Sequence, residues 1–405
     1  MSAFRLYLIA ITLCFPGLSS DLGAQDLSLT RPGSLTLFRP FSYAEEGIFT
    51  SVPFRVSRYL KIGYDDNASL RRTGGKGSAY GELGLSGSIN VGNERTQLNG
   101  DILAGIVGWL ERPGRKIDPD LGLNLAFNQQ FNETMVWRLA SSISYQTQPE
   151  ISSGVGSPNV IGNFLDAENK ISLGIQWAHR VATFTSYSLN LLHYDSFSAG
   201  RLQDRLEHLL SEEIRYLLHP AIVTIAEYRF GDVDYLHNGI ADSYSHYLLA
   251  GSDIAISHRL KLGFRAGTEL RYLNSPSQRE IVYPYAESNL MFLYRPESTI
   301  DWYNRYGLEQ PDTGQSGYRK TFRTGLKIAH RIGGKTKAIA AAYYSHNEYP
   351  SSFIENLAEV NLELDYQIIQ KLRVSAGFTF TRDFSDLSSR NYVRNRFYSG
   401  VSYEF

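Results

Sequence analysis

Residues 260–272 read LKLGFRAGTELRY, and apolar and polar side chains alternate along almost the whole run. Successive side chains of a β-strand point to opposite faces, so this period of two places Leu262 and Phe264 on one face and Arg265 and Glu269 on the other. The pattern predicts a strand that separates an apolar environment from a charged one. A soluble β-sandwich and a membrane-spanning β-barrel both contain such strands, so other features of the chain must distinguish them.

The same alternation recurs at residues 121–127, 137–145, 171–177, 322–328 and 372–380. Glycine, serine and other small polar residues dominate the second face, which suits the crowded, wet interior of a tilted barrel. No linker or change of composition interrupts the chain after about residue 53. The alternating segments therefore belong to one all-β unit.

The connections between these segments alternate in length. The short ones are residues 92–94, 132–133, 179–181, 219–220, 257–259, 295–297, 333–334 and 370–371. The long ones, richer in Gly, Pro, Ser and Asp, are residues 70–77, 113–119, 149–167, 196–203, 237–243, 275–282, 311–318, 350–352 and 386–391. Outer-membrane barrels have short periplasmic turns and longer outer loops. In a sandwich, nothing requires short and long loops to alternate along the chain. The connections therefore favour the membrane barrel.

Eight short turns and nine long connections predict eighteen strands, an even number as in bacterial single-chain barrels. Residues 205–218 have a second interpretation, because Leu206, Leu209 and Leu217 also form the apolar stripe of an amphipathic helix. We interpret them as a strand, since a helix would leave an odd count. The predicted fold is a transmembrane, antiparallel, up-and-down all-β barrel of about 18 strands over residues 54–405, with both ends in the periplasm.

The first residues have the features of a secretory signal. Arg5 precedes an apolar run at residues 6–15, and residues 22–24, Leu-Gly-Ala, supply a small-residue cleavage site. The apolar run is too short to cross a membrane as a helix. We expect residues 1–24 to be a cleaved signal peptide and residues 25–53 to be a periplasmic or plug segment.

The last predicted strand ends at Phe405 and places Phe397, Val401 and Tyr403 on one apolar face. It resembles the signal that the outer-membrane barrel-insertion machinery reads. We therefore expect an outer-membrane location, with that machinery and outer-membrane lipid as partners. Aromatic residues near strand ends are expected, as a set, at the level of the lipid headgroups, and for any single one of them plain packing within the strands is the alternative. These residues are Trp109, Tyr145, Tyr272, Tyr294, Tyr306, Tyr366 and Tyr403.

The composition argues against several classes of function. The 40 basic and 41 acidic residues balance, so no nucleic-acid partner is expected. Cys14 is the only cysteine and lies in the signal segment, which excludes disulfides and thiolate sites from the mature chain. No histidine pair has metal-ligand spacing, and no serine, histidine and acid set converges, so we predict neither an enzyme nor a cofactor. Asp65, Asp66 and Asn67 have two interpretations, a calcium site or a solvated loop start.

The predicted lumen carries charges of both signs. The candidate pore-lining residues are Lys261, Arg265, Glu269, Arg271, Asp301, Arg305, Arg323, Lys327, Glu359, Glu363, Asp365, Arg373, Arg394 and Arg396. Glu359, Glu363 and Asp365 form an acidic wall between basic strands, which predicts a transverse field that orients polar solutes. The alternative is that the charges pair across strands and only hold the barrel in shape. Residues 149–167, the longest connection, either fold inward and narrow the pore or form a flexible outer loop.

Two short motifs suggest a family. Residues 64–67, YDDN, and residues 228–235, YRFGDVDY, resemble segments of a family of outer-membrane β-barrel porins, and the strand rhythm is similar over residues 53–405. Such proteins are often linked to loci for exopolysaccharide synthesis and export. The resemblance therefore implies an export pore, with polysaccharide-export components as partners. The alginate-export barrel has a strongly arginine-rich lumen, and the mixed charges here depart from it.

The sequence thus predicts an outer-membrane channel, porin-like, that passes polar solutes or exports an exopolysaccharide. An outer-membrane enzyme of the lipase or protease type and a structural barrel are the alternatives.

Overall fold

The computed structural model describes residues 54–93, 95–147, 161–195, 201–237, 241–274, 280–312, 317–350 and 353–405. The predicted signal peptide, the segment 25–53 and most of the connection 149–167 lie outside these ranges, so the expectations for them stay predictions.

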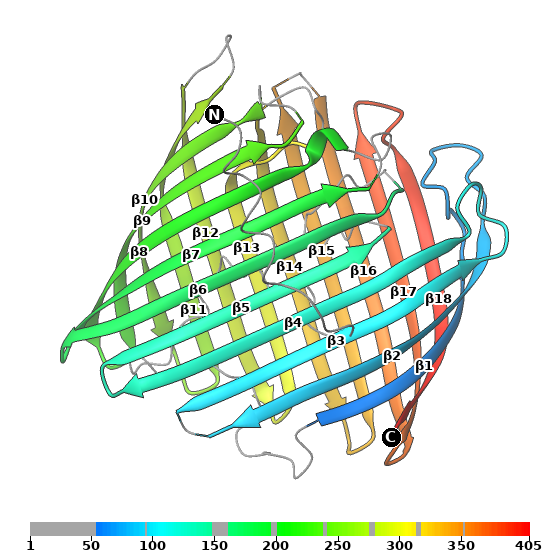
Figure 1. Cartoon of the computed structure of the whole chain (residues 1–405), viewed down its shortest axis with the longest axis horizontal. Helices are drawn as coiled ribbons and strands as arrows, with labels where there is room; N and C mark the ends of the chain where they lie inside the picture. The colour runs from blue at the N-terminus through cyan, green and yellow to red at the C-terminus, as the bar shows by residue number, and fades with distance from the viewer. Residues whose placement is uncertain are drawn as a thin grey trace, which may run out of the picture.

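Eighteen β-strands form one antiparallel sheet (Figure 1). The strands are β1 (Phe54–Asp65), β2 (Ser78–Gly92), β3 (Thr96–Trp109), β4 (Ile117–Asn132), β5 (Met135–Gln146), β6 (Phe164–Ala178), β7 (Val181–Tyr194), β8 (Arg205–His219), β9 (Ile222–Tyr235), β10 (Ser243–Ala255), β11 (Leu260–Leu273), β12 (Glu280–Arg295), β13 (Ser298–Glu309), β14 (Arg319–Ile332), β15 (Thr336–Tyr349), β16 (Phe353–Ile369), β17 (Leu372–Ser385) and β18 (Tyr392–Glu404). A short 3₁₀ helix, η2 (Arg201–Gln203), precedes β8. In the ranges given above, no helix is long and apolar enough to cross a membrane.

The sheet closes on itself. Each strand pairs with its neighbours in the sequence, and β1 also pairs with β18, with Ser57 opposite Glu404 and Asp65 opposite Arg396. The prediction of an eighteen-stranded, antiparallel barrel is therefore confirmed. The short turns lie at one end of the barrel, which we call the turn rim, and the long connections lie at the other, the loop rim (Figure 1).

Three of the long connections end three residues or more before the predicted position, and one of them is 275–282, because β12 already begins at Glu280. Strand β4 begins at Ile117 and already contains Pro119, and β6 begins at Phe164 and already contains Ala167. A proline lacks the N–H group that a second strand partner needs, which is why it suggested a loop. It fits in β4 because β4 pairs there with β3 alone, and its pairing with β5 starts at Leu121.

The ambiguous segment forms strand β8, as predicted. Leu210 and Ile214 are 48% and 55% exposed on one face, whereas Glu213 and Arg215 on the other face are buried. The stripe that suggested a helix is divided between the two faces, since Leu209 packs inward against buried tyrosines. The side chains of this segment therefore follow the two-residue period of a strand and not the 3.6-residue period of a helix.

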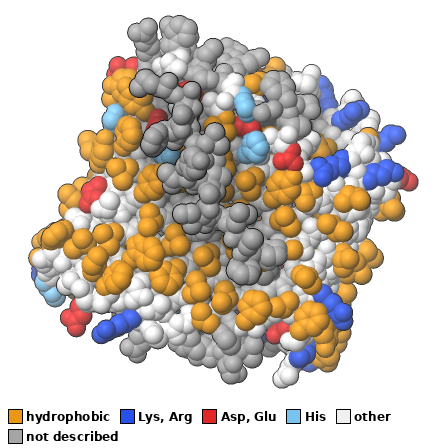
Figure 2. Space-filling view, in the orientation of Figure 1, with side chains coloured by type: hydrophobic (Ala, Val, Ile, Leu, Met, Phe, Trp, Pro, Cys, Tyr) orange, Lys and Arg blue, Asp and Glu red, His pale blue; other side chains and the backbone are white. Residues whose placement is uncertain are grey.

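Apolar side chains cover the outer wall of the barrel. Leu60, Ile62, Leu248 and Leu362 are exposed, Leu248 by 73%. Figure 2 shows hydrophobic side chains spread across the face that the first ten strands present to the viewer. A water-soluble protein does not expose an apolar surface of this extent, so the outer wall is suited to contact with lipid.

Most of the aromatic residues expected at the headgroup level lie on this outer wall, with Tyr306, Tyr366 and Tyr403 exposed. Trp109 follows the alternative, which is packing within the barrel. Its side chain is 4% exposed and lies on the same inner face of β3 as the buried Val107. A residue at a strand end reaches the headgroups only if its register turns it outward, and the register of β3 turns Trp109 inward.

Candidate functional site: the charged inner wall

The candidate pore-lining residues all lie on the inner face of the barrel, because they alternate with the exposed apolar side chains of the outer wall. On β11, Arg265 and Glu269 are buried, whereas Phe264 is 40% exposed. Lys261 and Arg271 share the face of Arg265; the others are Asp301 and Arg305 on β13, Arg323 and Lys327 on β14, Glu359, Glu363 and Asp365 on β16, Arg373 on β17, and Arg394 and Arg396 on β18. Their role in lining a water-filled pore remains a prediction.

One set of charged residues, contributed by β8 to β12, forms what we call the inner network. Its members are Glu213, Arg215, Glu227, Arg229, Asp253, Arg265 and Glu287. Each is at most 4% exposed. Removing a charge from water is costly unless opposite charges and hydrogen bonds compensate for the lost hydration. The network provides that compensation through ion pairs.

The ion pairs of the inner network cross the lumen-facing side of several strands. Nη2 of Arg229 lies 2.7 Å from Oε1 of Glu287, and its Nε lies 2.6 Å from Oε1 of Glu227. Nη1 of Arg265 lies 2.9 Å from Oδ1 of Asp253. Because β10 and β11 separate β9 from β12, the Arg229–Glu287 pair spans the concave inner face. The sector from β8 to β12 therefore has a packed inner surface.

Toward the turn rim, the inner network rests on apolar side chains. Val136, Phe184 and Ile225 belong to one buried cluster on the inner face. The guanidinium carbon of Arg215 lies 4.4 Å from the centroid of the Phe184 ring, a cation–π contact that joins the two layers. A Cβ atom on Gly174 would come within 2.6 Å of the same ring, so a glycine is needed at this position.

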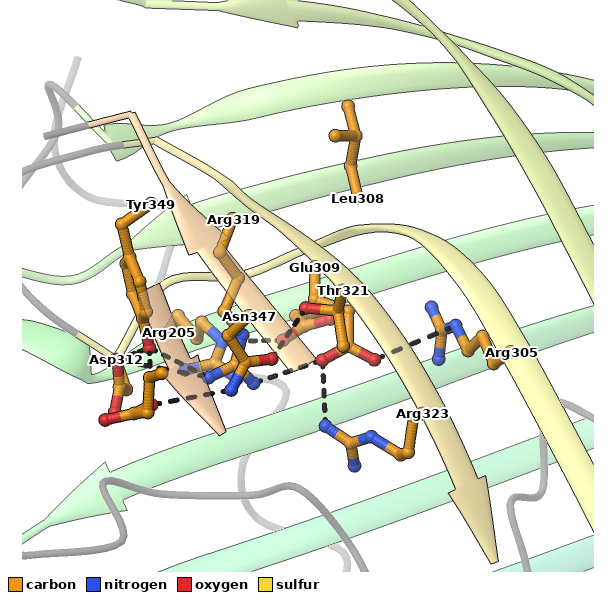
Figure 3. Close-up of polar contacts among 12 residues, drawn as sticks. Arg205, Arg305, Leu308, Glu309, Asp312, Arg319, Thr321, Arg323, Asn347 and Tyr349 are labelled. Carbon is orange, nitrogen blue, oxygen red and sulfur yellow. Dashed lines mark hydrogen bonds and ion pairs between the residues drawn. The ribbon is translucent and has the colours of Figure 1, made fainter. Parts of the chain in front are cut away.

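A second set of charged residues, the rim network, lies at the loop rim (Figure 3). Its members are Glu309, Asp312, Arg319, Arg323, Tyr349, Glu355 and Arg390. Nη2 of Arg319 and Nη2 of Arg323 donate to Oε2 of Glu309 at 3.1 and 2.8 Å. Arg390 forms ion pairs with both Asp312 and Glu355. The rim network thus connects β13, β14, β15 and β16 with two loops.

The two loop residues of the rim network are Asp312, after β13, and Arg390, before β18. Burial alone would raise the pKa of Asp312, but the Arg390 and Arg319 guanidinium groups lower it below its ordinary value. Burial opposes the charge of Arg390 too, but Asp312 and Glu355 raise the pKa of its guanidinium. Both residues stay charged, so the pair holds the two loops together.

Asp383 of β17 adjoins the rim network without joining it. Its side chain is 2% exposed, and neither carboxylate oxygen has a hydrogen-bond partner in the part of the chain that the structure describes. Glu355 and Asp312 repel its charge, and Arg390 attracts it. A buried carboxylate without hydrogen-bond donors destabilises a fold, so Asp383 marks a weak point of the inner wall.

A separate group of side chains, Trp109, Arg112 and Asp118, holds the connection between β3 and β4, and we call it the Arg112 clasp. Nη1 and Nη2 of Arg112 each lie 2.5 Å from one carboxylate oxygen of Asp118. Nε1 of Trp109 donates to the same carboxylate at 2.8 Å, and the Arg112 guanidinium carbon lies 4.8 Å from the centroid of the indole. The inward orientation of Trp109 is therefore used to hold a buried ion pair.

The side chains of Asp65, Asp66 and Asn67 bind protein groups, which corrects both interpretations of this tract. Oδ2 of Asp65 accepts from Nη2 of Arg394 at 2.5 Å, and Oδ1 of Asp66 accepts from the backbone N–H of Asn395 at 2.7 Å. Asn67 donates to the backbone of β18 as well. The tract thus ties the end of β1 to β18. Over the described ranges, no group of three or more side chains is arranged to hold a metal ion.

The acidic wall on β16 has polar partners on the neighbouring strands. Asp365 lies directly opposite Lys337 in the register of β15 and β16. Glu359 accepts hydrogen bonds from Asn361 at 2.9 Å and from Thr381 at 3.1 Å. Pairing across strands, the alternative interpretation of the inner charges, therefore accounts for part of the acidic wall.

Inner charges are more exposed on β17 and β18, near the turn rim. The side chain of Arg373 is 51% exposed, and its Nη2 lies 3.9 Å from Oε2 of Glu404, whose side chain is 26% exposed. Farther along the sheet, Asp301 lies opposite Lys327 in register, and both are only partly buried. Water can therefore reach this side of the inner wall, in contrast to the packed sector from β8 to β12.

Several residues of these networks were not among the sequence candidates. The alternation that identified Arg323 and Glu359 continues on the same strand faces to Arg319 and Glu355, so these two were detectable. Asp312 lies in a connection, where side chains follow no period, and Arg390 does too. Only the folded chain shows that such residues reach the inner wall.

The family model described as Putative beta-barrel porin 2 matches residues 54–405. The chain belongs to this family. The resemblance to barrel porins in the sequence is thereby confirmed, and the protein is a porin-like β-barrel of the bacterial outer membrane. No curated protein matches the sequence.

Solved structures with a similar fold include OccAB2 of Acinetobacter baumannii, which is 11% identical, covers 87% of this chain and 98% of its own, and has a TM-score of 0.42. OccK5 of Pseudomonas aeruginosa is 12% identical, with 87% and 98% covered and a TM-score of 0.42. The siderophore receptor PirA of Acinetobacter baumannii is 7% identical, with 88% and 81% covered and a TM-score of 0.43.

Proposed function

We propose that this barrel porin passes polar solutes of low net charge across the outer membrane, with an exopolysaccharide as its exported cargo. The observation that carries the proposal is the mixed charge of the inner wall. Acidic Glu363 and Asp365 on β16 share the inner face with basic Arg373 on β17 and Lys327 on β14. Neighbouring charges of opposite sign weaken the field felt by an ion, and carboxylate, ammonium and guanidinium groups are also able to hydrogen-bond to sugar hydroxyls.

The exposed inner charges near the turn rim support a path on the side of β14 to β18. The packed inner network makes the sector from β8 to β12 unsuitable for solute. The exopolysaccharide itself is inferred from the resemblance of residues 64–67 and 228–235 to barrels encoded beside polysaccharide loci. On that inference, polysaccharide-export components are partners at the turn rim, which faces the periplasm.

Reconstitution in planar bilayers tests the channel. We expect stepwise conductance and, under a salt gradient, a reversal potential close to zero, because the inner wall carries both signs of charge. Absence of conductance, both from the whole barrel and after removal of residues 25–52, would contradict the channel. A strong preference for one ion would contradict the solute class.

A deletion strain tests the cargo. Loss of the barrel should leave polymer in the periplasm and reduce it at the cell surface, and the wild-type chain should restore export. Unchanged surface polymer in a strain that lacks the protein would reject the export role but leave the conductance result standing.

We also propose that the barrel has no catalytic activity. His193, His208, His246, His330 and His346 all lie in strands on the outer wall. The carboxylates beside two of them, Asp204 beside His193 and Glu348 beside His346, belong to the connection before β8 and to the outer face of β15, and not to the inner face. A lipase or protease of the serine type needs a histidine beside its serine and acid. Turnover of ester or peptide substrates by purified protein, lost on substitution of an inner-wall residue, would reject this proposal.

The route to the membrane is a further part of the proposal. Cleavage after Ala24 should give a mature protein whose N-terminal sequence begins at Gln25, and a sequence beginning at Met1 would refute the signal peptide. Recognition of β18 by the insertion machinery predicts that Phe405→Ala lowers the yield of barrel in the outer membrane.

A further inference from the structure

The outer wall carries one acidic side chain near the middle of a strand, where a barrel in a bilayer meets hydrocarbon. Glu212 of β8 lies on the same face as the exposed Leu210 and Ile214 and near neither end of its strand. The other outward-facing charges of the described strands, such as Asp232 and Lys320, lie closer to the rims. A carboxyl group at this depth is unfavourable against lipid, and intramembrane ionisable residues usually have a protein partner.

The surroundings of Glu212 are polar as well. Oγ1 of Thr185 on β7 donates to Oε2 of Glu212 at 2.5 Å. On the same face, Oγ of Ser141 on β5 donates to Oδ1 of Asn169 on β6 at 2.7 Å. Hydrogen-bonding side chains thus follow one another across β5 to β8 on the lipid-facing wall. In the described part of the chain, neither Oε1 of Glu212 nor Nδ2 of Asn169 has a hydrogen bond.

The register places these two groups symmetrically about one residue. Asn169 of β6 is opposite Leu189 of β7, and Glu212 of β8 is opposite Thr185 of β7. Tyr187 lies between Leu189 and Thr185 on the same outer face and is 38% exposed. Barrel strands are tilted by roughly 40°, so the diagonal from Asn169 to Glu212 runs nearly parallel to the membrane plane. Tyr187 is its midpoint.

We infer that the wall formed by β6, β7 and β8 is the contact surface of a homodimer, with a second copy of this chain as its partner. A two-fold interface uses the same patch on both subunits, so the patch must be complementary to itself. A two-fold axis past Tyr187 brings the Glu212 carboxylate of one copy to the Asn169 amide of the other, and the reverse. The interface then contains two hydrogen bonds of the same kind, each from the Asn169 amide of one copy to the Glu212 carboxylate of the other.

The chemistry of the patch favours a second copy over a lipid headgroup. Lipopolysaccharide phosphates are bound by lysine and arginine, whereas this patch presents Glu212 with neutral Thr185, Ser141 and Asn169. Its centre is aromatic, since the Tyr187 ring lies on the axis and its hydroxyl is 2.7 Å from Nδ1 of His208. Aromatic side chains at the centre and polar groups around them are typical of protein interfaces.

Self-crosslinking at the axis tests the inference in intact outer membranes. The experiment uses the full chain with Cys14→Ser, so that the introduced thiol is the only one. Tyr187→Cys should give a disulfide-linked dimer on mild oxidation, because a residue on a two-fold axis faces its own copy. Leu362→Cys, an outward position on β16 that is 47% exposed, is the matched control and should stay monomeric.

Substitution of the paired groups gives the second test. Glu212→Leu and Asn169→Leu should each lower the crosslinked fraction of Tyr187→Cys at least tenfold, while heat-modifiable gel migration shows that the barrel is still folded. Glu212→Gln keeps an acceptor and should preserve the dimer. Monomeric Tyr187→Cys, or equal crosslinking at Leu362→Cys, overturns the inference. If Tyr187→Cys does not fold, a monomeric mass for the wild-type protein in lipid nanodiscs overturns it equally.

Discussion

At the scale of single residues, the inner wall shows that hydrogen-bond partners decide whether a buried carboxyl group stabilises the fold. Asp118 and Asp383 are both nearly buried acids of the inner face, with exposed fractions of 4% and 2%. Asp118 accepts two hydrogen bonds from Arg112 and one from Trp109, whereas Asp383 accepts none from the described residues. The same side chain is therefore stabilising at one site and destabilising at the other.

Because of this contrast, the same substitution of aspartate by asparagine should have opposite effects on thermal stability at the two sites. Asp383→Asn should raise the midpoint of thermal unfolding in detergent, because a neutral amide replaces a buried carboxyl group that lacks hydrogen-bond donors. Asp118→Asn should lower that midpoint, because it leaves the Arg112 guanidinium buried without its counter-charge. Circular dichroism melts at neutral pH measure both. A fall for Asp383→Asn would mean that its carboxylate is satisfied by a group outside the described ranges.

Asp312 makes a prediction about pH. Its pKa is lower in the folded barrel than in the unfolded chain, so its contribution to stability is complete above the unfolded pKa of about 3.9 and is lost as pH falls through the folded pKa. Wild type should exceed Asp312→Asn in stability at neutral pH, and the difference should shrink only in strong acid. Urea unfolding at several pH values measures it. Glu348→Gln, at a side chain that is 48% exposed, is the control and should show little difference.

At the scale of elements, the alternation of side chains predicted strands well, including β8, whose leucines also matched a helix. The alternation also predicted the face of every candidate inner residue. The apolar residues of a strand identify its outer face, and the residues between them must lie on the inner face. For Trp109, the register of β3 and not the aromatic character of the side chain decides the position. The alternation could not anticipate Asp312 and Arg390, because residues in loops follow no period and meet only after the chain has folded.

The hairpin of β3 and β4 gives a prediction at this scale. Arg112→Met removes one partner of a buried ion pair and should cost about 3 kcal/mol of unfolding free energy. Arg331→Met removes an exposed pair with Glu297, whose side chains are 40% and 38% exposed, and should cost less than about 1 kcal/mol. Urea unfolding followed by tryptophan fluorescence measures both. Equal costs would contradict the view that the Arg112 clasp holds the hairpin.

At the scale of the whole molecule, the inner wall divides into two sides. The inner network covers the side of β8 to β12, its apolar base extends to β5 and β7, and the more exposed charges lie at the turn rim on the other side. The sequence predicted inner charges of both signs but not this division, because ion pairs such as Arg229 with Glu287 skip two strands. The alternation of side chains shows on which face of a strand a residue lies. It does not show how the sheet curves, so it does not predict ion pairs between strands that are not neighbours.

The division predicts where ion preference can be changed. The double substitution Glu363→Gln and Asp365→Asn should shift the reversal potential toward anion preference, and Arg373→Gln should shift it toward cation preference, because these groups lie on the proposed solute path. Glu227→Gln in the packed sector is the control and should leave the reversal potential unchanged. Equal shifts from both sectors would place the path elsewhere.

The seam between β1 and β18 has a consequence for how the protein folds. Hairpins between consecutive strands form from neighbours in the chain, but Ser57 and Glu404 must meet across almost the entire sequence, which is slow because of the entropy lost in closing so long a loop. Until they meet, the sheet has two open edges whose unpaired N–H and C=O groups invite aggregation. The Asp65–Arg394 pair and the bonds of Asp66 and Asn67 fasten that seam once it forms. The time this chain spends with open sheet edges is therefore set by how fast its first and last strands meet.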